Sequence, residues 1–115
     1  ISLVGWIIAG IFMILLQPLG EELVFRGLMF PAFRGTFGVW LGFWMVIGFH
    51  TLFHFLAYQP ATPNTTFLLW YGVGLPFLDA LVITSVRAYT GSTRASLVSH
   101  AMIGAFAVIK ALTFA

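Results

Sequence analysis

Long apolar stretches separated by short polar breaks dominate this chain, and they indicate membrane-spanning helices. A span takes about 20 mostly apolar residues, and the stretches 1–17, 37–58, 66–86 and 95–115 meet or approach that length. A shorter segment, 19–33, carries two acids and an arginine between the first two stretches. We therefore expect an all-α polytopic transmembrane helix bundle, with about four spans and a shorter helix that bears a motif.

Glycine, proline and small polar residues predict where these helices end. Pro18-Leu19-Gly20 is expected to separate the first helix from the acidic one, and Gly35-Thr36 to end the latter. Residues 59–64 read as a turn-rich loop, and residues 90–93 as the turn before the last helix. Inside the third stretch, residues 72–76 contain two glycines and a proline, and we expect the helix to break there.

The predicted break also concerns the depth of two histidines. His54 lies about 25 Å along its helix from residue 37, whereas His100 lies only about 8 Å from residue 95, at 1.5 Å per residue. Straight upright helices would keep these side chains at different levels. We expect a broken third stretch to let the last helix begin well inside the membrane, so that the two histidines meet.

Composition supports the membrane assignment and excludes other classes. The 115 residues are 61% hydrophobic and 7% charged, against about 25% charged in soluble domains. Five basic residues are scattered along the chain and form no patch for nucleic acid. Cysteine is absent, so thiolate chemistry is excluded. We expect one domain, 1–115, and expect it to be a segment of a longer chain because it starts on Ile1 without methionine.

The basic residues also predict the orientation of the chain. Arg34 lies in one predicted loop, and Arg87 and Arg94 flank another, whereas the loop 59–65 carries no charge. Cytoplasmic loops carry the excess of lysine and arginine, so the two basic loops should face the cytoplasm. We expect a multi-pass protein of a bacterial or archaeal plasma membrane.

The ionisable residues are concentrated, and an ionisable side chain within a membrane is by default a functional hypothesis. Glu22 and Arg26 are spaced i, i+4 and so lie on one helix face. This pair can be a structural salt bridge or part of a site. One arginine cannot neutralise two buried carboxylates, so Glu21 becomes a candidate general base.

Three histidines supply possible partners for that base. His50 and His54 share one face of the second span, and His100 lies on the last. A lone membrane histidine is often a hydrogen-bond partner between helices. Three of them with two glutamates, in otherwise apolar helices, favour a single shared polar site.

These residues resemble the motifs of the CPBP family, which contains the CAAX-type prenyl proteases and bacteriocin-processing enzymes. The family's Glu-Glu-x-x-x-Arg motif matches the string GEELVFRG, residues 20–27. Its Phe-x-x-x-His motif falls on His54, and its His-x-x-x-Asn motif falls on His100 in SLVSHAMIG. The likeness covers residues 17–110.

The resemblance implies an intramembrane endopeptidase with a site at Glu21, Glu22, Arg26, His54 and His100. Glu21 and His54 would polarise the attacking water, and His100 would help to hold the oxyanion. Glu22 and Arg26 would brace the site. The substrate would be a peptide or protein, with a prenylated or membrane-anchored one among the candidates.

The chain departs from the family pattern at two positions. Gly104 stands where the family usually has asparagine, a second oxyanion donor, and His50 stands four before His54 where the family has phenylalanine. Loss of one such donor costs about a hundredfold or more in turnover. If His100 lacks its companion, Gly104→Asn should restore a donor and raise turnover.

Two other readings and a metal question stay open. A non-catalytic membrane scaffold or bacteriocin-immunity-type binding protein would keep the fold with a degenerate site, and an ion or proton pathway would use the same buried acids. A zinc ion would be held by Glu21, His54 and His100. We expect that no cofactor is required. A zinc site usually combines a His-x-x-x-His pair with a nearby acid, and His50 and His54 have no acid between them.

Overall fold

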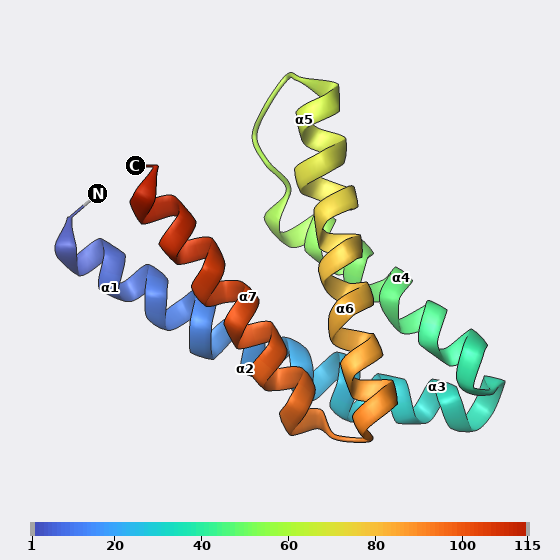
Figure 1. The fold of residues 1–115 in the computed structure, drawn as a ribbon. Coiled ribbons are helices and arrows are strands. Elements are labelled where there is room, and N and C mark those ends of the chain that lie inside the picture. The colour runs from blue at the N-terminus through green and yellow to red at the C-terminus, as the bar shows by residue number, and fades with distance from the viewer. Residues whose placement is uncertain (1, 115) are drawn as a thin grey trace.

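Residues 2–114 are described by a computed structural model, and this part of the chain is helical without any strand (Figure 1). The elements, with η for π-helical turns, are α1 (Leu3–Ile11), η1 (Phe12–Leu16), α2 (Gln17–Glu22), η2 (Leu23–Met29), α3 (Phe30–Phe37), α4 (Val39–Tyr58), α5 (Thr65–Leu69), η3 (Trp70–Gly74), α6 (Leu75–Thr90) and α7 (Thr93–Thr113).

These elements join into four continuous helices that are long and apolar enough to cross a membrane. They are Leu3–Phe37, Val39–Tyr58, Thr65–Thr90 and Thr93–Thr113. The expected all-α transmembrane bundle is therefore confirmed. The short motif-bearing helix is not a separate element, because it continues directly from the first span.

The breaks expected at Pro18 and at residues 72–76 were wrong, because both helices run through their prolines. Pro18, Pro31 and Pro76 each come two residues after a π-helical turn: η1, η2 and η3 end at residues 16, 29 and 74. A helical proline clashes with the carbonyl four residues earlier. In each case that carbonyl, at 14, 27 or 72, belongs to the wider π turn. The π turn accommodates the proline without ending the helix.

The other expected helix ends follow the local chemistry of the chain. The first helix ends two residues later than predicted, at Gly38, whose φ of 90° suits glycine. Gly91 ends α6 with a φ of 67°, and the Ser92 side chain accepts from the Ala95 amide to cap α7. The loop 59–64 is confirmed, and Asn64 caps α5.

Two helix contacts place the site. α7 packs along η1 and α2 of the first helix, and α4 packs against α3 and α6 (Figure 1). The acidic segment α2–η2 thus lies where α4, α6 and α7 approach it from different sides. Close approach of α3 and α4 depends on Gly42, since a Cβ there would lie 2.7 Å from the Arg34 amide nitrogen.

Candidate active site

Arg26 is the centre of a buried polar network. Its guanidinium is fully buried and its Nη1 donates to Glu22 Oε2 at 3.1 Å, which confirms the predicted i, i+4 pair. From α6, Thr84 Oγ1 accepts from Nε at 3.2 Å and from Nη2 at 2.9 Å, and the Ala80 carbonyl accepts from Nη2 at 3.3 Å. Arg26 therefore ties the first helix to α6.

The contact between Arg26 and His50 determines which nitrogen of His50 carries a proton. Arg26 Nη1 lies 2.7 Å from His50 Nδ1, and an arginine can only donate. Nδ1 therefore accepts, and Nε2 carries the hydrogen. Nε2–H donates to Glu21 Oε1 at 2.8 Å. The Phe25 ring stacks on His50 with centroids 4.5 Å apart, which fixes the plane of the imidazole.

His100 reaches the same network from α7. Its Nδ1 donates to Glu22 Oε2 at 2.7 Å, and its Nε2 lies 3.9 Å from Glu21 Oε2. Glu21 Oε2 is buried and makes no hydrogen bond with any described protein atom. The two carboxylates, Arg26, His50 and His100 thus form one cluster drawn from the first helix, α4 and α7.

His54 lies in a cavity beside this cluster and makes none of its hydrogen bonds among the described residues. The structure sets His50, one helical turn earlier, against Glu21, and no hydrogen bond joins Glu21 to His54 among the described residues. His54 instead faces a neighbouring cavity, with its Nδ1 buried and without a hydrogen-bond partner in the described chain. Its ring packs near that of Tyr58, with centroids 5.1 Å apart.

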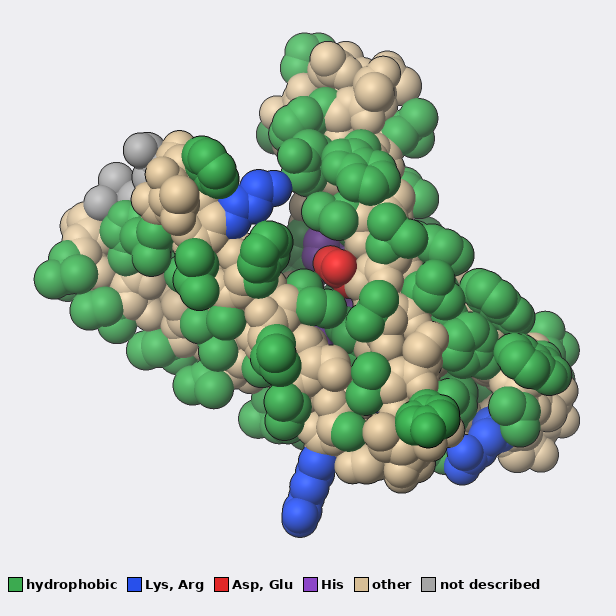
Figure 2. Space-filling model, in the orientation of Figure 1, with side chains coloured by type: hydrophobic (Ala, Val, Ile, Leu, Met, Phe, Trp, Pro, Cys, Tyr) green, Lys and Arg blue, Asp and Glu red, His purple; other side chains and the backbone are tan. Residues whose placement is uncertain are grey.

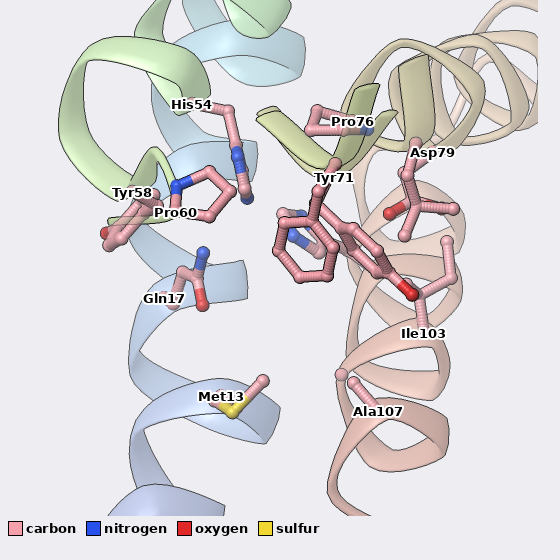
Figure 3. Close-up of a pocket in the computed structure, with 14 residues that line it drawn as sticks. Met13, Gln17, His54, Tyr58, Pro60, Tyr71, Pro76, Asp79, Ile103 and Ala107 are labelled. Atoms are coloured by element: carbon pink, nitrogen blue, oxygen red, sulfur yellow. The ribbon is translucent and has the colours of Figure 1, made fainter. Parts of the chain in front are cut away.

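A cavity of about 380 Å³ opens beside the cluster (Figure 3). His54 and His100 both line it, although the helix Thr65–Thr90 is unbroken, so the break was not needed to bring them to one cavity. Glu21 lines an adjoining cavity of about 280 Å³, and Gln17 and Tyr58 line both. Figure 3 shows the Gln17 amide and the His54 ring directed into the larger space.

The expectation for Gly104 was wrong in its physical basis. A Cβ at this position would lie on the carbonyl oxygen of Met13 and 3.0 Å from its carbonyl carbon. Gly104 is buried where α7 meets the π-helical turn η1. It is a backbone contact between two helices, so asparagine would separate them and could not be added as a donor.

The conditional zinc set does not fit the arrangement. Among residues 2–114, no group of three or more His, Asp or Glu side chains is placed to hold a metal ion. Glu21 Oε1 is committed to His50, and His54 lies one turn beyond. That no cofactor is needed stays a prediction.

Sequence reasoning gave His50 no specific role and missed two further contributors to the site. His50 had a signal, since it replaces the family's phenylalanine on the face that carries His54. Thr84 had none, because a threonine in an apolar span commonly hydrogen-bonds to a carbonyl of its own helix, and Gln17 had none because it belongs to no motif. Only the packing of helices brings Thr84 to Arg26 and Gln17 to the cavity.

The sequence matches the profile of the family described as type II CAAX prenyl endopeptidase Rce1-like over residues 3–106. The chain belongs to this family. The matched residues include every acid and histidine of the chain, so the resemblance found from three short motifs is confirmed. Comparisons with curated proteins and with solved structures gave no significant match. Membership in the Rce1-like family points to a CAAX-protease type of membrane-embedded endopeptidase.

Proposed function

We propose that this protein is an intramembrane endopeptidase in which Glu21 activates water to hydrolyse a peptide bond. The observation that carries this proposal is the state of the Glu21 carboxylate. Its Oε1 accepts from His50, while its buried Oε2 has no partner in the described chain and lies 3.9 Å from His100 Nε2. A fixed carboxylate with one free oxygen beside a second polar group is suited to general-base catalysis.

The reaction follows from these positions. Glu21 Oε2 takes a proton from a water molecule as its oxygen attacks the scissile carbonyl, forming a tetrahedral intermediate with a negative oxygen. The C–N bond then breaks, and the proton held by Glu21 passes to the leaving amine. The products are a carboxylic acid and an amine, so no other reactant is required.

The negative oxygen of the intermediate needs donors in a site from which water is largely excluded. The Glu22 contact orients His100 so that Nε2 faces Glu21, and in its protonated form this nitrogen can donate. Gln17 is our proposed second donor, in place of the asparagine that the family usually has where this chain has Gly104. It lies one turn before Glu21 on the same face and lines both cavities.

Glu22 and Arg26 support the reacting groups without touching the substrate in this proposal. Arg26 holds His50 in the form that donates to Glu21, and Glu22 holds His100. His54 borders the cavity and is placed to contact the bound peptide. Of the open alternatives, a scaffold would not require this division of the two carboxylates between base and brace.

The test is cleavage of membrane-anchored peptides by the purified protein in liposomes. Paired internally quenched peptides, with a prenylated or an unmodified cysteine, report both turnover and the need for a lipid group. Glu21→Gln should lower kcat at least a hundredfold, since loss of a general base costs about 100- to 10,000-fold. Arg94→Gln, an exposed change, is the matched control and should keep parental activity.

The outcomes separate the alternatives. Hydrolysis lost in Glu21→Gln, kept in Arg94→Gln and insensitive to a metal chelator agrees with the proposal. No hydrolysis by the folded parent of either peptide favours the scaffold. Hydrolysis that survives Glu21→Gln removes the proposed base.

A further inference from the structure

Asp79 is an acid within a membrane span that the proposed reaction does not use. It lies on α6, half-buried, and lines the same cavity as His54 and His100. It also lines a third cavity, of about 370 Å³, that extends between α6 and α7 and shares Leu75, Ile103 and Ala107 with the 380 Å³ cavity. The carboxylate therefore lies where the two cavities join.

The surroundings of Asp79 give it no partner among the described residues. No salt bridge or side-chain hydrogen bond among the described residues involves its carboxylate, and Lys110, the other charged residue of the third cavity, forms no salt bridge with it. In Figure 2 an acidic side chain and a histidine are visible in the hollow between α6 and α7, surrounded by hydrophobic side chains.

An unpaired carboxylate in a mostly apolar groove is costly to maintain within a membrane, so such residues ordinarily mark a functional site. Arg26 has a similar cost, but a dense set of partners offsets it. No described side chain supplies a partner of this kind to Asp79, so its carboxylate is open to a group from outside the described chain. The groove adjoins the proposed site of peptide hydrolysis, which makes the bound peptide the natural source.

We propose that Asp79 is a specificity-determining residue that binds a cationic side chain, lysine or arginine, of the substrate near the scissile bond. This inference rests on the proposed endopeptidase function. A carboxylate prefers a full positive charge to a neutral donor where water is scarce. The shared cavity places Asp79 next to His100, so the cationic residue would lie close to the bond that is cut.

The experiment uses the protein in liposomes and an internally quenched peptide library. One position at a time, on either side of the cut, carries lysine, its uncharged counterpart glutamine, or glutamate. The parent should cleave the lysine peptide on the order of tenfold better in kcat/KM than the glutamine peptide at one position. This factor lies between the values of exposed and of buried ion pairs, and the glutamate peptide should be the poorest.

Asp79→Asn should remove this preference while cleaving the glutamine peptide within about twofold of the parent, because a pair is lost and the reacting groups are not. Asp79→Lys should reverse it toward glutamate. Lys110→Gln is the control for the other charge of the groove and should keep the lysine preference. A parent that cleaves the peptides with no preference at any position, or a preference that survives Asp79→Asn, overturns the proposal.

A binding measurement separates this inference from the proposed reaction. Anisotropy of the same peptides on Glu21→Gln, with and without Asp79→Asn, reports recognition without turnover. If the parent cleaves nothing but the lysine peptide binds through Asp79, the subsite stands and the endopeptidase proposal fails. If peptides are cleaved but neither cleavage nor binding depends on Asp79, the subsite fails and the endopeptidase stands.

Discussion

At the residue scale, the site is a buried cluster in which each polar group restricts the next. Arg26 can only donate, so His50 must accept from it and donate to Glu21. Glu22 accepts from Arg26 and from His100 at once. A chain of contacts thus fixes which oxygen of Glu21 stays free, although Arg26 itself lines neither the 380 Å³ nor the 280 Å³ cavity.

The pair Glu22–Arg26 could be predicted from sequence because i, i+4 spacing is a property of a single helix. The partner of Glu21 could not be predicted in the same way. His50 and His54 share a face, but they differ in height by about 6 Å, four times the rise per residue. Which of them meets Glu21 depends on how α4 crosses the first helix, and the sequence does not state that crossing.

Arg26→Ala tests the structural importance of the cluster. It leaves the buried Glu22 carboxylate without its charge partner, and we expect the free energy of unfolding to fall by about 3 to 5 kcal/mol. Reversible denaturation in mixed micelles measures the change. Arg94→Ala removes an exposed arginine and should change stability by no more than about 0.5 kcal/mol. Equal stability of the two variants would mean that the Arg26 network contributes little.

His50→Gln and His54→Gln test which histidine serves Glu21. Glutamine cannot accept from Arg26 and donate to Glu21 with the geometry of imidazole, so His50→Gln should lower kcat on the order of a hundredfold with KM nearly unchanged. His54 lines the cavity, so His54→Gln should change mainly KM, with little effect on kcat. Steady-state kinetics on one peptide measures both. The reverse pattern would return the role to His54, as the motif alone suggested.

At the element scale, π-helical turns let the helices continue where prolines predicted breaks, and a glycine lets two helices approach closely. A proline signals a break when only local propensity is considered. Here η1, η2 and η3 widen the helix before Pro18, Pro31 and Pro76, and the helices continue. Gly104 of α7 packs directly against the backbone of the widened turn η1. The sequence shows the three prolines and Gly104, but whether a helix continues through a proline, and which backbone a glycine contacts, depends on tertiary packing.

Gly104→Ala tests this contact against a matched glycine. A methyl group at Gly104 meets the Met13 carbonyl, and we expect a loss of about 1 to 3 kcal/mol, as for other overpacked positions. Gly48 lies in the middle of α4 with nothing within 4 Å of a Cβ. Gly48→Ala should therefore stabilise by up to about 1 kcal/mol through helix propensity. Unfolding of both variants in the same micelles provides the comparison, and a stabilised Gly104→Ala would contradict the packing.

At the scale of the whole molecule, the distribution of polarity is that of a membrane protein. Among the described residues the buried set contains Glu21, Glu22, Arg26, His50 and Arg87, while large apolar side chains cover the outside (Figure 2). Composition alone predicted this, because so few charges cannot cover a soluble surface. The polar centre could be predicted as a cluster, whereas the cavities beside it required the assembled helices.

The orientation of the molecule gives a final prediction, and the absence of cysteine from the sequence makes the test clean. The α3–α4 and α6–α7 turns lie at one end and the loop 59–64 at the other (Figure 1). Arg34 and Arg94 flank the two turns, whereas the loop carries no charge. The excess of basic residues should hold the turns in the cytoplasm.

Cysteine labelling tests this orientation. Arg34→Cys would itself remove one of the charges that set the orientation, so the probes are Ala61→Cys in the loop and Ser92→Cys in the α6–α7 turn. In intact bacterial cells, a membrane-impermeant maleimide should label Ala61→Cys readily and Ser92→Cys only after the membrane is opened. Ser92 also caps α7, so a second probe of that turn is needed. Gly91→Cys would be strained at a φ of 67°, and Thr90→Cys is therefore the second probe. Labelling of Ser92→Cys and Thr90→Cys in intact cells, with Ala61→Cys protected, would show the opposite orientation.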